Sequence, residues 1–181
     1  MRMKTSDENL ALAAAGGDGD AFGVLMARHY DRLFGLCYRL TGHHADAQDL
    51  THDIALALPA KLSGFRGQAR FTTWLYRVAV NAAHDRRRRH ATHARATRGW
   101  GNWEVSRRAE IAEDQANCTW LKEAMQGLPD DLRDTLALTL EDGMTHAQAG
   151  QILNLSEGTI SWRMGEVKKH LRALYEKEAE A

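Results

Sequence analysis

The stretch THAQAGQILNLSEGTISWRMGEVK, residues 145–168, decides the fold of the C-terminal part of this chain. It predicts two short helices joined by a three-residue turn, because Ser156 can cap the second helix and the small residues Ala149 and Gly150 permit a close crossing. Apolar side chains at helical spacing fill the crossing: Ile152, Leu155, Ile160, Met164, Val167 and Leu171. The pattern is that of a helix-turn-helix, with a plain helical hairpin in a bundle as the alternative.

The opposite face of the second helix carries polar and aromatic side chains that a DNA major groove could receive. These are Thr159, Ser161, Trp162, Arg163, Glu166 and Lys169. Glu166 can accept a hydrogen bond from N4 of cytosine, or it can simply pair with Lys169 or His170 across one helical turn.

The composition favours helices throughout the chain. Of its 181 residues, 44% are hydrophobic and 27% charged, values typical of a globular protein. Only two prolines occur, Pro59 and Pro129, and Leu and Ala are abundant while β-branched residues are sparse. Because proline breaks helix interiors and β-branched residues favour strands, we expect an all-α protein.

The compartment can also be inferred from the sequence. The apolar runs are far shorter than the about 20 residues that a membrane-spanning helix needs. Asp7 and Glu8 stand where a signal peptide would be apolar, and the two cysteines, Cys37 and Cys118, are too few for a disulfide framework. We therefore expect a protein of the reducing cytoplasm.

A net charge of zero hides a strong polarity along the chain. Residues 66–98 hold nine basic and one acidic residue, a net charge of +8. Residues 104–142 hold four basic and ten acidic residues, a net charge of −6. The basic stretch predicts contact with a polyanion, and the acidic stretch predicts a cationic or apolar partner or a solvated surface.

Helical periodicity divides the chain into two small helical domains, over residues 1–92 and 113–181, joined by a flexible linker over 93–112. In the first domain we expect helices at 8–15, 18–42, 46–62 and 71–89, with Pro59 bending or shortening the third. In the second we expect a helix that ends near residue 127, followed by helices at 129–142, 145–153 and 157–175. The linker contains Trp100 and Trp103, which would either contact the surface of a partner or pack locally on one of the two domains.

Several motifs resemble those of a known family. LPDDLRDTL (128–136), EDGMT (141–145) and GTI (158–160) resemble region 4 of the extracytoplasmic-function (ECF) sigma factors of the sigma-70 family. DAQDL (46–50), FRG (65–67) and FTTWLYR (71–77), together with Asn81 and Asp85, align without gaps to region 2 of the same family. The two resemblances stand in the expected order and cover about 150 residues.

The resemblance implies a transcription initiation factor, not an enzyme, that needs no cofactor and no metal. Its expected partners are core RNA polymerase, promoter DNA and an anti-sigma factor, and a stress response is the expected setting. Aromatic side chains and the arginine run at 86–89 suit the binding of an unpaired, negatively charged strand.

The resemblance also implies three sets of site residues. Core polymerase would meet Asp46, Gln48, Asp49, His52 and Asp53. The −10 element would meet Ser63, Phe65, Arg66, Gln68, Arg70, Trp74, Arg77, Asn81, Arg86 and Arg88. The −35 element would meet the groove face defined above: Thr159, Ser161, Trp162, Arg163, Glu166 and Lys169.

Some of these residues have ordinary alternatives. Trp74 can be a core residue, Asn81 a neutral surface residue, and the acids at 46–53 partners of a helix dipole. If Asn81 does line a pocket for a flipped base, its amide can pair with the Watson–Crick edge.

The chain departs from the family at four positions. Pro59 and Ala55 stand where large aromatic residues are usual, which affects the end of the polymerase-binding helix. Ser161 and Glu166 stand where basic residues are common, which implies fewer phosphate contacts and a different base readout.

Three other classes of protein fit the sequence less well. Nine histidines and two cysteines could suit a metal or redox sensor, but no zinc-finger spacing occurs. No glycine-rich phosphate loop or nucleophile motif suggests an enzyme. A simple helix-turn-helix repressor would leave the first 90 residues unexplained.

Overall fold

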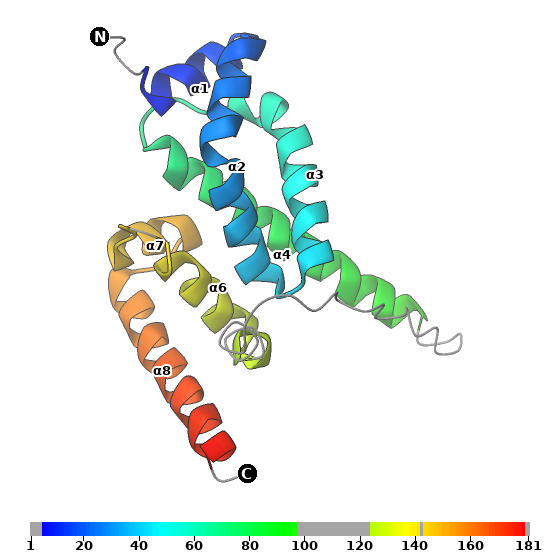
Figure 1. Ribbon diagram of the computed structural model, residues 1–181, viewed down its shortest axis with the longest axis vertical. Coiled ribbons are helices and arrows are strands. Elements are labelled where there is room, and N and C mark those ends of the chain that lie inside the picture. Colours follow the sequence, from blue (N-terminus) through cyan, green and yellow to red (C-terminus); the bar gives the residue numbers. More distant parts are fainter. Residues whose placement is uncertain (1–4, 98–123, 142, 180–181) are drawn as a thin grey trace.

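The computed structural model describes residues 5–97, 124–141 and 143–179, and every regular element within these ranges is a helix (Figure 1). The N-terminal region contains α1 (Asp7–Ala15), α2 (Gly19–Thr41), α3 (His44–Leu62) and α4 (Phe71–Thr97). The C-terminal region contains α6 (Asp130–Thr139), α7 (His146–Leu153) and α8 (Glu157–Ala179). The all-α prediction is confirmed.

Capping residues and glycines set the bounds of α2, as the sequence predicts. Asp18 Oδ1 accepts a hydrogen bond from the backbone N–H of Ala21 at 3.0 Å, and the helix ends at Gly42 in the left-handed conformation, with φ of 76°. Between these ends, Leu25, Leu33 and other apolar residues at helical spacing are buried against α1, α3 and α4.

Pro59 does not end α3, which continues for three more residues to Leu62. A proline inside a helix removes one backbone hydrogen bond. Leu58 and Leu62, on either side of Pro59, are almost completely buried, so packing holds this last turn in place.

The fourth helix extends beyond its expected end at residue 89 and reaches Thr97. No glycine or proline occurs between residues 71 and 97 to stop it. The arginine run therefore lies within a helix rather than at its end. Trp100, Trp103, Cys118 and most of the helix expected to end near residue 127 lie outside the described residues; residues 124–127 are helical.

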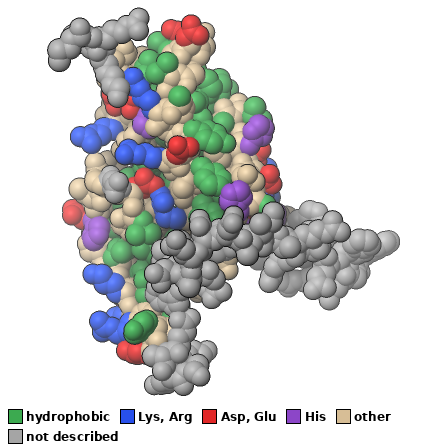
Figure 2. All heavy atoms as spheres, in the orientation of Figure 1, with side chains coloured by type: hydrophobic (Ala, Val, Ile, Leu, Met, Phe, Trp, Pro, Cys, Tyr) green, Lys and Arg blue, Asp and Glu red, His purple; other side chains and the backbone are tan. Residues whose placement is uncertain are grey.

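The two regions pack against each other. The α2 helix lies against α6 and α4 lies against α7, and the buried apolar residues of both regions form one continuous cluster. In the orientation of Figure 2, Lys and Arg side chains lie on the left side of the molecule over both regions.

Candidate nucleic-acid and polymerase interface

The helix-turn-helix is held by its caps and one tight turn. Thr145 and Gln148 form a capping box at the start of α7. Asn154 adopts the left-handed conformation, with φ of 58°, and the N–H of Leu155 donates to the carbonyl of Gly150 at 2.8 Å. A Cβ at Gly150 would lie only 2.7 Å from the Leu155 carbonyl oxygen, so the turn requires glycine there.

This turn fixes the angle at which α8 leaves the domain and so presents its outer face. Ser161, Trp162 and Lys169 are exposed, and 62% of Trp162 is open to solvent. Thr159 is half-buried at the start of the helix. Its backbone N–H donates to the Ser156 hydroxyl at 3.1 Å, which caps α8.

Several polar side chains on this face have partners within the protein. Ser161 Oγ lies 2.9 Å from Nδ1 of His146, the first residue of α7, which the sequence analysis did not single out. Glu166 pairs with Lys169 at 2.6 Å, one of the two alternatives named for it.

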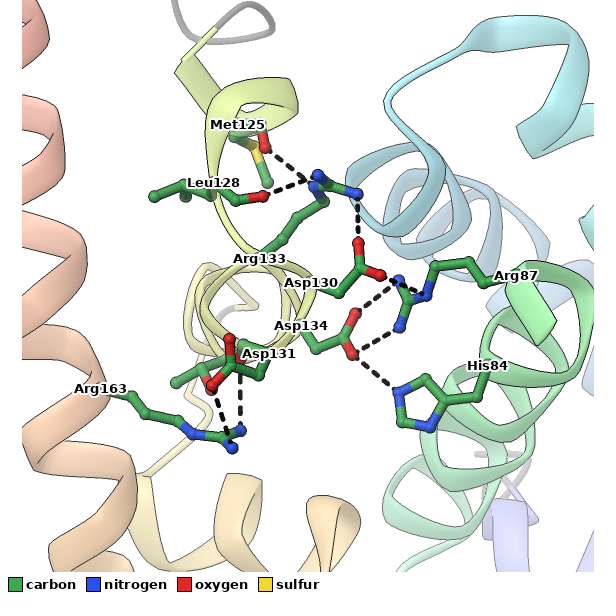
Figure 3. A network of polar contacts seen from close by, with 10 residues as sticks. His84, Arg87, Met125, Leu128, Asp130, Asp131, Arg133, Asp134 and Arg163 are labelled. Carbon is green, nitrogen blue, oxygen red and sulfur yellow. Dashed lines mark hydrogen bonds and ion pairs between the residues drawn. The ribbon is translucent and has the colours of Figure 1, made fainter. Parts of the chain in front are cut away.

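The guanidinium of Arg163 lies 3.3 Å from the carboxylate of Asp131 and turns toward α6 (Figure 3). Only 18% of the Arg163 side chain is exposed, so reading DNA would require it to leave this ion pair.

The loop between α3 and α4 combines an aromatic anchor with an exposed polar rim. The rings of Phe65, Phe71 and Trp74 contact one another with centroids 5.5–5.9 Å apart, and Phe65 and Phe71 are buried. The expected site residues Ser63, Arg66, Gln68 and Arg70 are exposed around this anchor. Phe65 is thus a core residue that holds the loop. Trp74 is half-buried, which agrees with the alternative that it is a core residue.

Asn81 is exposed on α4, beyond this loop along the chain. Arg77, one turn earlier, donates to the backbone carbonyl of Gln151 in α7. The face of α4 expected to bind DNA is therefore partly covered by the C-terminal region.

The arginine run divides into inward and outward members. Arg86 reaches Asp46 at 2.9 Å, Asp49 at 3.3 Å and Asp53 at 3.9 Å, which are three of the expected polymerase contacts. Arg87 pairs with carboxylates of α6. Arg88 is 78% exposed and pairs only locally with Asp85 among the described residues.

The outer face of α3 carries the expected polymerase contacts. The side chains of Asp49 and Asp53 are 70% and 66% exposed, and Gln48 and His52 are exposed beside them. Leu56, 68% exposed, continues the same face one turn beyond Asp53. Leu56 is not among the expected contacts, although its spacing from His52 and Asp53 places it on the same face of the helix.

The sequence analysis also missed a set of polar residues that join the two regions: Arg39, Tyr76, His84, Asp134 and Glu141. The opposite charges of residues 66–98 and 104–142 were the available signal, but pairing between these two stretches was not among the alternatives considered for them.

The described part of the chain offers no cluster of three or more His, Cys, Asp or Glu side chains that could hold a metal ion. Burial raises the pKa of the Cys37 thiol to about 11, which keeps it protonated and unreactive. Within the same residues, no helix is both long and apolar enough to cross a membrane.

Comparison with known proteins agrees with this geometry. Residues 25–93 match the family described as Sigma-70 region 2, and residues 124–173 match Sigma-70, region 4, together about two thirds of the chain. The chain is 28% identical to the ECF RNA polymerase sigma factor SigW of Bacillus subtilis, over 86% of this chain and 89% of that protein. It is 29% identical to the ECF sigma factor SigM of Mycobacterium tuberculosis, over 96% of this chain and 86% of that protein.

Solved structures show the same fold. The structure of CnrH in complex with the cytosolic domain of CnrY is 26% identical, with a TM-score of 0.70, and the match covers 96% of this chain and 99% of CnrH. The sigma factor RpoE of Bartonella quintana, solved with the anti-sigma factor NepR, has a TM-score of 0.71 at 21% identity, covering 86% of this chain and 96% of RpoE. The chain therefore belongs to the extracytoplasmic-function sigma factors of the sigma-70 family, non-catalytic proteins that direct core RNA polymerase to promoter DNA.

Proposed function

We propose a division of labour among three surfaces of this sigma factor. The outer face of α3 binds core polymerase, the 63–70 loop with Asn81 and the basic side of α4 holds the opened −10 strand, and the outer face of α8 reads the −35 element. Residues 1–92 and 113–181 act as the two functional domains on either side of the linker at 93–112. The observation that carries this proposal is the exposed Trp162 beside Ser161, on a helix whose direction a tight turn fixes.

A matched pair of aromatic substitutions tests the assignment to α8. Trp162 and Tyr175 lie on the same helix and are 62% and 67% exposed, but only Trp162 belongs to the proposed groove face. Trp162→Ala should weaken −35 binding by holoenzyme by about 1–3 kcal/mol, or roughly 5- to 150-fold, through lost contact with a base edge. Tyr175→Ala should leave it near wild type, and equal effects of the two variants would remove the assignment.

We also propose an anti-sigma partner, a stress-related signal and a cytoplasmic location. The support is the similarity to CnrH, which was solved with the cytosolic domain of CnrY, and the need for a sigma factor to reach RNA polymerase. An inhibitor of this kind should lower the affinity of the chain for core polymerase. Transcription that is unaffected by saturating amounts of a bound partner would show that the partner has another role.

A further inference from the structure

The first helix of the helix-turn-helix contacts the groove face of the second through one pair of polar side chains. Nδ1 of His146 lies 2.9 Å from Oγ of Ser161, although the two residues are 15 positions apart in the sequence. His146 is the first residue of α7 and is half-buried, whereas Ser161 is exposed one turn into α8. The hydroxyl that faces the proposed groove therefore also has a partner within the motif.

Caps and packing hold the two residues of this pair in place. The capping box of Thr145 and Gln148 orders the first turn of α7, which carries His146. The α7 helix lies against α8, and Ile152 of α7 and Ile160 of α8 are buried in the same apolar cluster. Because both side chains stand on helices that the core fixes, their contact is built into the motif.

The partner of a serine hydroxyl decides what the hydroxyl can offer to a base, since it has one proton to donate and two lone pairs that accept. If Nδ1 of His146 has no proton, Ser161 donates to it and the lone pairs of Oγ stay available. If Nδ1 carries a proton, Oγ accepts from it and the hydroxyl proton stays available. In the major groove, adenine N6 and cytosine N4 donate, whereas guanine O6 and thymine O4 accept.

The position of His146 favours the state in which Nδ1 has no proton. The free backbone N–H groups at the start of α7 carry positive partial charge, which favours a ring lone pair over a ring N–H beside them. In a neutral imidazole the other nitrogen then carries the proton. Nε2 of His146 has no hydrogen-bonding partner among the residues that the structure describes, so it is left to carry this proton.

We propose that His146 is a positioning residue that sets the base preference of Ser161. By accepting the Ser161 hydroxyl proton, it leaves the lone pairs of Oγ to the groove, where they select a base with an exocyclic amino group, adenine or cytosine, at one position of the −35 element. Guanine and thymine present acceptors at that edge, which these lone pairs do not satisfy. The inference rests on the proposed function of α8, and His146 acts through Ser161 without touching DNA.

The test uses holoenzyme reconstituted from core RNA polymerase and the full chain, with a promoter library randomised over the −35 element. Sequencing of the bound promoters gives the base preference at each position. Wild type should prefer adenine or cytosine at one position by about 2- to 10-fold, the discrimination that a single hydrogen bond provides. Ser161→Ala and His146→Ala should each abolish this preference and leave the other positions unchanged.

Two further variants separate positioning from a structural role. His146→Asn should retain the preference, because its Oδ1 can accept the hydroxyl proton in place of Nδ1. His146→Ala should add nothing in the Ser161→Ala background, since the two residues act as one unit. His170→Ala is the matched control: His170 is exposed on α8 outside the groove face, so its loss should change no base preference.

Each other outcome overturns a stated part of the account. A preference that Ser161→Ala removes and His146→Ala leaves intact would refute the role of His146. A preference for guanine or thymine at the position sensitive to Ser161, or an equal loss at every position in His146→Ala, would also refute it. If His146→Ala loses helical circular dichroism, His146→Leu, of similar bulk and without ring nitrogens, replaces it under the same criteria.

Trp162→Ala distinguishes failure of this inference from failure of the proposed function. If Trp162→Ala changes the −35 preference and Ser161→Ala changes none, the inference is wrong while α8 still reads the element. If neither variant changes any position, the assignment of the −35 element to α8 is wrong.

Discussion

Single residues of α4 differ in what surrounds them. Arg86 and Arg87 are 20% and 26% exposed and reach carboxylates of α3 and α6, whereas Arg88 is 78% exposed. From the sequence, the whole arginine run at 86–89 suits the binding of a negatively charged strand. The structure separates two arginines that join parts of the protein from Arg88 and Arg89, whose side chains are exposed and, among the described residues, bond only to Asp85 of the same helix.

Neutralising Arg88 and Arg89 together, as Gln, should weaken promoter binding and lower the slope of log affinity against log salt by about 1–2 units. Each arginine that contacts a phosphate releases counterions from the DNA on binding, so removing the contact reduces the number of counterions released. Filter binding of holoenzyme at several salt concentrations measures this slope. The same change at Arg86 and Arg87 should also lower the thermal midpoint, and an unaltered slope for Arg88 and Arg89 would mean that these arginines are only solvated.

Asn81→Ala should impair promoter opening while leaving closed-complex affinity near wild type. Opening must offset the few kcal/mol needed to unstack a base, and an amide on the exposed side of α4 can contribute contacts that alanine cannot. Permanganate footprinting on a duplex promoter measures opening.

A promoter with a pre-melted mismatch bubble serves as the control for Asn81, because its unpairing cost has already been removed. Activity of Asn81→Ala should largely return on this template. An equal defect on duplex and bubble, or none on either, would refute the role of Asn81.

At the scale of elements, local sequence signals predict the helices well. Ser156 caps α8 as the sequence predicts, and the observed caps Asp18, Gly42 and Thr145 lie at the ends of the ranges expected for α2 and α7. Local signals fail at Pro59, because the burial that carries α3 to Leu62 comes from other helices. They also fail for Asp134, whose partners lie 47 and 50 residues away. Periodicity identifies which side of a helix is buried but not which distant element covers it.

The turn between α7 and α8 depends on Gly150. Gly150→Ala places a methyl group against the Leu155 carbonyl and should destabilise the domain by about 1–3 kcal/mol. Gly165→Ala in α8, where nothing lies within 4 Å of the added carbon, should stabilise it by up to about 1 kcal/mol. Thermal denaturation of both variants checks the signs, and a stabilising Gly150→Ala would contradict the tight crossing.

The α1 helix is tied to the rest of the N-terminal region by Asp7, which contacts Arg28 and His29 at 2.7 Å. Burial alone would raise the pKa of Asp7, but the hydrogen bonds and charges of Arg28 and His29 outweigh it and lower the pKa. A carboxylate whose pKa is lower in the folded state than in the unfolded state stabilises the fold at pH values above its unfolded-state pKa. This stabilisation is lost as the pH falls through its folded-state pKa.

Asp7→Asn should therefore cost about 1 kcal/mol at neutral pH, from lost charge-assisted hydrogen bonds. Denaturant unfolding of wild type and variant between pH 7 and pH 3 provides the measurement. The two curves should converge as wild-type Asp7 becomes protonated below its lowered pKa. A gap that stays constant down to pH 3 would show that charge on Asp7 is not the cause.

At the scale of the whole molecule, stretches of opposite charge that are separate in the sequence meet within the fold. The basic stretch at 66–98 and the acidic stretch at 104–142 leave the net charge at zero. In this structure, Arg87 of α4 pairs with Asp130 and Asp134 of α6, so the two stretches neutralise each other in part where the two regions pack together.

The most direct measurement is transcription reconstituted from core RNA polymerase and this chain on genomic DNA, with RNA 5′ ends mapped by sequencing. The account predicts discrete start sites that are absent with core alone. Each should be preceded by two shared sequence elements, one at the −10 position and one at the −35 position, which regions 2 and 4 would read. Identical starts with and without the chain, or promoter binding that does not require core polymerase, would contradict it.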